Sequence, residues 1–445
     1  MLKLVRRPML MARLTARPTA LSWVLLAALV VRLSWALRAA GAGPLFLVSG
    51  DQYSYWYLGN SIADGDGYSL PSSDAPTAYY PVGFPLVLGA LYWSTNHTPL
   101  PDGEVWVTTG YHVVIGTIAV WLVHLIAESL FDRRVALIAA WITALLPGLV
   151  FYVATFSVEL TFIVLMLAAL AIVVRHDWPT GVPPTTARLV AFGATLGAAT
   201  LVRPFAVPML LGVLLALRQT GIGWGSAARR TGIAAGVVVL MAVPWAIRNA
   251  IEMDAFVPIS TNLGDTLCMD RTEHANGTFR FAGDDGCADP AMDEVDRNRT
   301  NATRAWTFVT SHPLKEMELV GLRAFRMMEH DHSGLDEIEA NGSHSFSDTT
   351  EGTVMRAIAD WFFYGVGLLA VVAAVRDRRR LLAGPRNTLV LVTGLAIFLI
   401  PLVLWGNTRF HVPLLPFMAI GAAAWWRHDA VRDRRQNHAP EVAAG

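Results

Sequence analysis

The sequence predicts an all-α membrane protein that crosses the bilayer about ten times. Of its 445 residues, 54% are hydrophobic and only 16% are charged, whereas soluble domains carry about 25% charged residues. Mean hydropathy is +0.43. Apolar runs of about 20 residues recur along the chain, and basic residues gather on one side of them. Acidic and basic residues balance, so no nucleic-acid partner is expected.

Ten apolar runs are predicted to span the membrane. They cover about residues 20–40, 105–127, 135–153, 157–174, 188–202, 204–218, 231–248, 357–375, 387–405 and 409–426. The fifth and sixth runs are short and meet at Arg203-Pro204. One broken hairpin is therefore an alternative to two separate spans.

The basic residues predict the orientation, because cytoplasmic segments of membrane proteins are enriched in Lys and Arg. With the N-terminus inside, the inner segments hold 21 of the 35 Lys and Arg residues, the outer segments hold 12 and the first span holds two. The outer stretch 41–104 has six acidic residues and no basic one. Both termini are therefore predicted to be cytoplasmic. A cleaved signal peptide is an alternative for the first run, although Arg32 interrupts that run.

This topology divides the chain into five parts. They are a basic tail at 1–19, seven spans over 20–248 with an outer loop at 41–104, a large outer loop at 249–356, three spans over 357–426 and a tail at 427–445. The only two cysteines, Cys268 and Cys287, lie in the large outer loop. An oxidising compartment permits a disulfide there, but two unrelated thiols fit the sequence equally well.

The non-membrane mass lies in the two outer loops, so any chemistry is expected on the exoplasmic face. The inner segments are short and contain no phosphate-binding loop. A donor substrate would have to arrive already activated, most simply on a lipid. The first loop predicts two amphipathic helices on the membrane surface, one carrying Tyr55, Leu58 and Ile62, the other Phe84 and Leu88.

Asp51 stands at the start of the first amphipathic helix, where the helix dipole favours an ionised carboxylate. Its position fits a reactive acid and a helix-capping residue equally well. Glu159 falls at the outer end of the fourth span. An acid buried in the membrane is expected to be functional, whereas an acid at the membrane surface needs no functional role, and the position of Glu159 fits both. Arg203 and Arg409 occupy short outer turns.

Arg248 stands at the outer boundary of the seventh span. It either binds a ligand or extends its charge from the membrane to the water. The segment His330-Asp331-His332 has no zinc-site spacing, and no metal is assigned.

Taken together, these residues resemble the membrane-embedded GT-C glycosyltransferases. The similarity is to the family 39-like branch related to protein O-mannosyltransferases and the aminoarabinose transferase of lipid A. Four groups of residues carry it: Ser-Gly-Asp-Gln-Tyr-Ser-Tyr at 49–55 with Tyr-Pro-Val-Gly-Phe-Pro at 80–85, Ser-x-Glu-Leu at 157–160, Pro-Trp-Ala-Ile-Arg-Asn at 244–249 with the stretch 256–264, and Asn-Thr-Arg-Phe-His-Val-Pro at 407–413.

The resemblance implies a role for each of these residues. Asp51 becomes the catalytic base, and Tyr53 and Tyr55 beside it are expected to contact substrate. Arg203, Arg248 and Arg409 are expected at the lipid phosphate of the donor, and Glu159 is expected to position substrate. Many family members have two adjacent acids where this chain has Asp51-Gln52, so a metal that needs a second carboxylate is left undecided.

The expected reaction moves a sugar from a polyprenyl-phosphate donor to a hydroxyl of a glycan, lipid or protein acceptor, with membrane lipids around the protein. A sugar phosphate leaves without protonation, so one carboxylate can suffice and the anomeric carbon inverts. Two alternatives stay open. One is a transporter or flippase for lipid-linked saccharides, and the other is a ligase that moves a whole glycan.

Overall fold

The computed structural model describes residues 19–40, 50–71, 75–95, 103–272, 274–279, 287–288, 290–340, 346–381 and 383–427. Nearly all of both predicted cytoplasmic tails lies outside these ranges. Within them the chain is helical, and β structure is limited to the isolated bridges Ser69–Pro76 and Thr278–Gly406. The all-α fold predicted from the sequence is confirmed.

The helices have the following order along the chain. They are α1 (Ala20–Ala40), α2 (Gly50–Asp64), α3 (Gly83–Thr95), α4 (Gly103–Leu130), α5 (Arg133–Leu145), α6 (Pro147–Phe151), η1 (Tyr152–Ala154), α7 (Glu159–Val174), α8 (Thr186–Val202), η2 (Pro204–Ala206), α9 (Met209–Gln219), α10 (Trp224–Glu252), α11 (Leu263–Cys268), α12 (Glu294–Ser311), α13 (Pro313–Met327), α14 (Ser333–Ala340), α15 (Thr350–Leu381), α16 (Pro385–Val403), η3 (Thr408–Leu414), α17 (Leu415–Ala423) and η4 (Ala424–Trp426).

Five of these helices are long and apolar enough to cross a membrane on their own, namely α1, α4, α10, α15 and α16. The predicted span 135–153 is instead a bent pair, α5 followed by α6 and η1, with an angle of 55°. Pro147 lacks the backbone N–H that a continuous helix would need and breaks it there. The stretch 159–219 forms shorter apolar helices, and 409–426 is divided among η3, α17 and η4.

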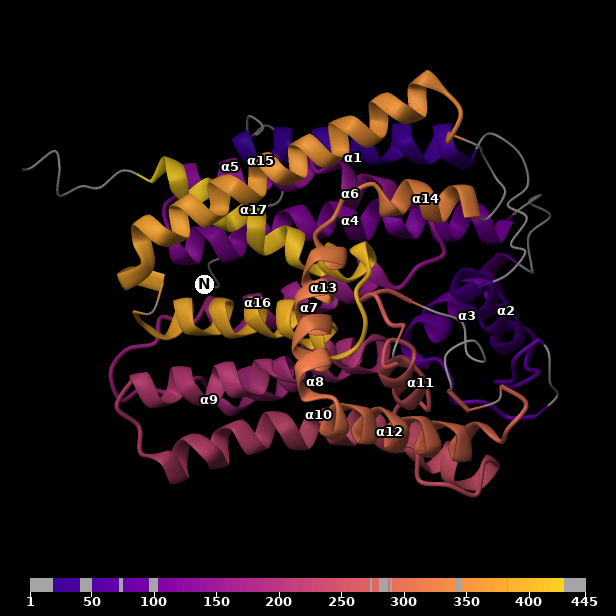
Figure 1. The fold of residues 1–445 in the computed structure, drawn as a ribbon. Helices are drawn as coiled ribbons and strands as arrows, with labels where there is room; N and C mark the ends of the chain where they lie inside the picture. The colour runs from indigo at the N-terminus through magenta and orange to yellow at the C-terminus, as the bar shows by residue number, and fades with distance from the viewer. Residues whose placement is uncertain are drawn as a thin grey trace, which may run out of the picture.

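The long helices run side by side, and α2, α3, α11 and α12 gather at one end of the bundle, which we call the loop end (Figure 1). Helix α7 is the innermost helix, packed between α4 and α8 and also touching α16. Most of its apolar side chains are buried by protein, whereas α10 exposes Val239, Leu240 and Ile251. Exposed apolar side chains along a long helix are typical of a surface that faces lipid, and the chain is an integral membrane protein.

Helix α13 ties the loop end to the bundle through a buried ionic cluster. Arg323 is fully buried and donates to Asp270 at 2.8 Å, to Glu316 at 2.7 Å and to the carbonyl of Leu402 at 3.1 Å. A buried guanidinium is stable only where carboxylates and carbonyls satisfy it in this way. A disulfide joins Cys268 at the end of α11 to Cys287, with their Cα atoms 6.0 Å apart.

The break at Pro147 is compensated by Arg32, which sequence patterning marks only as an interruption of the first span. Arg32 is fully buried in α1 and donates to the carbonyls of Thr143 at 3.2 Å and Ala144 at 3.0 Å. These carbonyls belong to the last turn of α5, where the helix supplies no further backbone donors. The buried charge of α1 therefore stabilises the kinked helix beside it.

Replacing Arg32 with methionine should destabilise the protein by about 1.5–3 kcal/mol, the value of a buried hydrogen bond to a charged group. The measurement is thermal unfolding of the purified protein in detergent. Arg38→Met is the matched control, because Arg38 lies on the same helix with its side chain half exposed and paired with Glu351. Equal melting temperatures for the two variants would contradict this account of Arg32.

Candidate active site

Asp51 lies in the first turn of α2 at the loop end, directly after Gly50. Gly50 has a φ of +84°, a backbone conformation that glycine adopts without strain. The two carboxylate oxygens of Asp51 accept different donors, the Tyr80 hydroxyl at 2.9 Å and Nη1 of Arg409 at 2.7 Å. The side chain is 43% exposed. Asp51 is therefore oriented by side chains on both oxygens and still reaches the surface.

Arg409 connects the acidic residues of the site. It lies at the start of η3, where the side chain of Asn407 accepts from its backbone N–H at 2.8 Å. Its Nη1 reaches Asp51, its Nε donates to Glu159, and Glu337 lies 4.0 Å from Nη1. A planar guanidinium can hold several carboxylates in fixed directions, which a lysine ammonium cannot.

Glu159 is the first residue of α7 and is fully buried. Its Oε1 accepts from both Arg409 and Nη2 of Arg203, the latter at 2.9 Å. Two buried atoms of this trio, Oε2 of Glu159 and Nη1 of Arg203, have no hydrogen-bond partner among the described residues. Three rings surround the Arg203 guanidinium at 5.4–6.0 Å: Phe162, Phe205 and Phe410. The site thus keeps one buried acceptor and one buried donor unused.

Glu337 is a site residue that sequence reasoning missed. It lies on α14, and its Oε2 accepts from Nε2 of Gln52 at 2.5 Å. The amide oxygen of Gln52 accepts from the backbone N–H of Phe156 at 2.9 Å. Gln52 therefore fixes the loop before α7 and α14 to α2. The second carboxylate near Asp51 comes from a part of the chain more than 280 residues away.

Tyrosine side chains form one wall of the site. Tyr55 is buried and meets the rings of Tyr80 and Phe84 edge-on at 5.0 and 5.3 Å. Tyr80, another residue that sequence reasoning did not assign to the site, donates to Asp51. Tyr53 lies away from this wall and stacks on Trp56 at 5.9 Å. The structure thus brings Tyr55 to the site and leaves Tyr53 in a separate aromatic cluster on the same helix.

Burial and charge set the protonation of two of these groups. Burial, with the neighbouring Asp51 carboxylate, raises the pKa of Tyr80 well above its usual value of 10.0, so the hydroxyl stays a donor to Asp51. Burial also raises the pKa of Glu337 above 4.5, against the opposing attraction of Arg409. The site therefore contains a neutral phenol, three carboxyl groups and two guanidinium groups, a set that can accept one proton and hold an anion.

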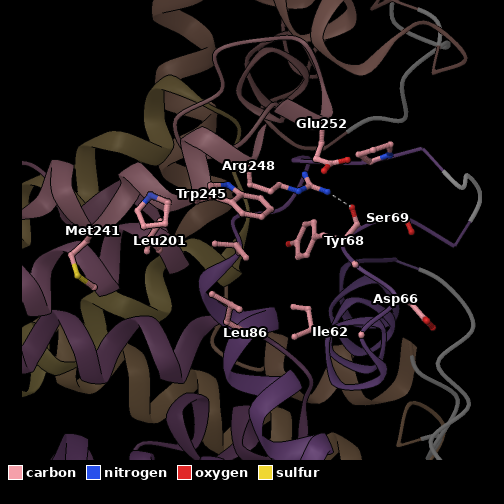
Figure 2. A pocket seen from close by; sticks show the side chains of 15 residues that line it. Ile62, Asp66, Tyr68, Ser69, Leu86, Leu201, Met241, Trp245, Arg248 and Glu252 are labelled. Carbon is pink, nitrogen blue, oxygen red and sulfur yellow. Dashed lines mark hydrogen bonds between the residues drawn. The ribbon is translucent and has the colours of Figure 1, made fainter. Parts of the chain in front are cut away.

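The structure places Arg248 apart from this cluster. Its guanidinium donates to the carbonyls of Tyr68 at 2.9 Å and Thr77 at 2.7 Å, and lies over the ring of Trp245 at 5.1 Å. Figure 2 shows Arg248 and Trp245 extending from α10 toward Tyr68. They line a cavity of about 760 Å³ with Glu252 and the apolar side chains Ile62, Leu86, Leu201 and Met241. In this structure Arg248 secures the loop that leads to Tyr80.

The residues found only in the structure carried weak signals in the sequence. Tyr80 lies in the Tyr-Pro-Val-Gly-Phe-Pro stretch of the resemblance, so its motif was recognised but its contact was not. Glu337 lies in a short helix of the large outer loop with no motif around it. The packing of α14 against α6, η1 and η3 brings it to the site.

Comparison with known proteins identifies the fold. Residues 96–247 match the model of the family described as dolichyl-phosphate-mannose-protein mannosyltransferase. That range includes Glu159 and Arg203 but neither Asp51 nor Arg409. Among curated proteins, none matches the chain in sequence.

Solved structures match over nearly the whole chain. The apo oligosaccharyltransferase of Archaeoglobus fulgidus is 14% identical with a TM-score of 0.51, over 90% of this chain and 50% of that one. The same enzyme tethered to an acceptor peptide containing the NVT sequon is 15% identical with a TM-score of 0.50, over 91% and 49%. ArnT from Cupriavidus metallidurans bound to undecaprenyl phosphate is 15% identical with a TM-score of 0.44, over 91% and 78%.

The chain has the GT-C fold of membrane glycosyltransferases. This confirms the GT-C-like fold predicted from the sequence. The chain spans about half the length of the archaeal oligosaccharyltransferase that it matches. The GT-C fold brings together Asp51, Glu159, Arg203 and Arg409 from four separate parts of the chain.

The raised pKa of Glu337 predicts a pH dependence of stability. Because the folded state holds this proton more tightly than the unfolded state, Glu337 adds stability at acidic pH, and this contribution is lost as pH rises through the folded pKa. Wild type should therefore gain thermal stability relative to Glu337→Gln between pH 7 and pH 5. Glu318→Gln, at an exposed glutamate on α13, is the control. A pH-independent difference between wild type and Glu337→Gln would contradict the assignment.

Proposed function

We propose that this protein is a glycosyltransferase that moves a sugar from a polyprenyl-phosphate donor to an acceptor hydroxyl on the exoplasmic face of the membrane. The convergence of Asp51, Arg409, Glu159 and Arg203 carries the proposal. It joins a surface-accessible carboxylate to two arginines inside a largely dehydrated cluster. The matched family is named for a donor of this kind, a sugar carried on a lipid phosphate.

Asp51 acts as the general base. Its carboxylate is exposed enough to meet an acceptor, while Tyr80 and Arg409 fix its direction. It takes the proton of the acceptor hydroxyl as that oxygen attacks the anomeric carbon. The lipid phosphate leaves from the opposite side of the same carbon, so the configuration inverts. Holding the carboxylate in position before the reaction lowers the entropic cost of reaching this geometry.

The arginines stabilise the leaving phosphate. Arg203 has a buried Nη1 without a partner in the described part of the chain, and this donor is available to a phosphate oxygen. Arg409 adds a second positive charge beside Asp51. Glu159 orients both guanidinium groups through one carboxylate oxygen. Charge-assisted hydrogen bonds in a site with little water are stronger than those in solution, and they strengthen as negative charge builds on the phosphate.

The acceptor class is left open by these residues, and a glycan, a lipid or a protein hydroxyl would serve. Transfer of a whole glycan is the second candidate, because the fold matches that of an oligosaccharyltransferase. A transporter is a third reading of the same topology. The three functions can be distinguished by the polyprenyl lipids of the cell, because each function predicts that a different lipid accumulates, or none, when the protein is lost.

Mass spectrometry of polyprenyl lipids tests the proposal without knowledge of the acceptor. Cells lacking the protein and cells with Asp51→Asn should both accumulate a polyprenyl-phosphate monosaccharide that wild type consumes. Asp64→Asn, at the other end of α2, is the control and should behave as wild type. Membrane levels of each variant are measured alongside.

Three other outcomes would each correct the proposal. Accumulation of a lipid-linked oligosaccharide would favour glycan transfer. Accumulation in the null strain but not in Asp51→Asn would remove Asp51 as the base. An unchanged pool in every strain would favour transport.

Arg409→Lys tests the role of the planar guanidinium. A lysine ammonium cannot hold Asp51 and Glu159 in these two directions, so turnover of the accumulated donor should fall about 100-fold, as for loss of one transition-state donor. Arg326→Lys is the control, because Arg326 pairs with Glu329 at the surface. Turnover of Arg409→Lys within a few-fold of wild type would remove Arg409 from the reaction.

A further inference from the structure

A second group of titratable side chains lies where the segment between α13 and α14 meets α15, and it shares no residue with the proposed active site. His330 and His332 flank Asp331 between α13 and α14, and Asp360 lies on α15. The two imidazole rings stack at 3.9 Å between centroids, 12° from parallel. One ligand atom from each of His330, His332 and Asp360 falls within 4.8 Å of the other two.

The separation between His332 and Asp360 is close to that of two ligands of a single metal ion. Two ligands of a tetrahedral zinc ion, each about 2.0–2.1 Å from the metal, lie about 3.3 Å apart. Nδ1 of His332 is 3.0 Å from both oxygens of Asp360. Nδ1 of His330 is buried and has no hydrogen-bond partner among the described residues. This nitrogen can serve as a third donor once the two stacked rings turn apart, because the lone pair of each imidazole lies in its own ring plane.

Contacts around the group hold Asp360 and the residue between the two histidines. The backbone N–H of Asp331 donates to Oδ1 of Asp360 at 2.9 Å. The carboxylate of Asp331 accepts from the N–H of Gly148 at 3.2 Å, and a Cβ at Gly148 would collide with it. Metal ligands are characteristically oriented by hydrogen bonds of this kind.

We propose that His330, His332 and Asp360 bind a divalent transition-metal ion, with zinc as the best fit to two imidazoles and a carboxylate. The ion replaces the proton between Nδ1 of His332 and Asp360, and that proton is released to solvent. A water molecule completes the coordination.

The ion joins the loop between α13 and α14 to α15, and its effect extends toward the active site. Asp331 also hydrogen-bonds Nε2 of His411 at 2.9 Å, and His411 lies on η3 two residues after Arg409. The metal is therefore a positioning element for η3, and it does not contact the reacting groups.

The sequence spacing hides this site. A His-x-His pair alone has no zinc-finger or metalloprotease spacing, and the third ligand follows 28 residues after His332. Only the packing of α15 beside the loop places Asp360 against both imidazoles.

Metal analysis of the full-length protein tests the site. Tag-free protein in detergent is stripped with a chelator, incubated with ZnCl₂, desalted and analysed by elemental mass spectrometry. Wild type should retain about one zinc per chain. Asp360→Asn and His330→Ala should bind zinc at least 100-fold more weakly, because loss even of an indirect partner of a metal ligand costs 10–100-fold. His312→Ala replaces an exposed histidine between α12 and α13, and this variant should bind zinc as wild type does.

Two further measurements separate this site from misfolding and from the active site. Cobalt-loaded wild type should show the visible absorption of a low-symmetry His and carboxylate site, a signature that does not depend on any variant. Asp51→Asn should retain the zinc, because Asp51 is not a ligand. Absence of bound zinc in wild type, or equal zinc in wild type and Asp360→Asn, would overturn the proposal. Loss of zinc in Asp51→Asn would instead move the ion to the proposed active site.

Discussion

The guanidinium of Arg409 is the interaction on which the site depends. It is almost fully buried and lies among the carboxylates of Asp51, Glu159 and Glu337. Removing such charges from water is costly, and the cost is recovered only when every partner is in place. Each carboxylate comes from a different helix, so the cluster forms only when α2, α7 and α14 have all packed around η3. The charged cluster of the site therefore forms only when these helices have assembled.

The charges of this cluster lie where helices begin, end or break. Glu159 begins α7, Arg203 follows the last residue of α8, and Arg409 lies in the 3-10 segment before α17. A continuous helix would carry its polar residues into the hydrocarbon, where each charge is costly. Proline at 204 and 413 ends or loosens the helix at these points. The polar site therefore lies where the helices are short or broken. These are also the helices that differ most from the predicted spans.

The sequence predicted those parts of the molecule that depend on local patterning. Apolar runs located the helices, and the resemblance to the GT-C glycosyltransferases singled out Asp51, Glu159, Arg203 and Arg409 near the ends of these runs. Glu337 could not be found in this way, because α14 carries several charged residues. Asp360 lies inside the predicted span 357–375, and the sequence does not show which residues pack against it. Arg248 has the same local signal as Arg203, and only tertiary packing separates them, one against loop carbonyls and the other against Glu159.

The buried Arg32 also constrains how the protein is made. A span carrying an arginine near its middle enters the membrane at a cost of about 2.5–3.5 kcal/mol when it is alone. The carbonyls that satisfy Arg32 belong to Thr143 and Ala144, more than 100 residues later in the chain. Until α5 has been inserted beside α1 during synthesis, Arg32 has only the Ala28 carbonyl of its own helix as a partner among these contacts. The order in which helices leave the translocation machinery and pair with one another is thus part of what this sequence encodes.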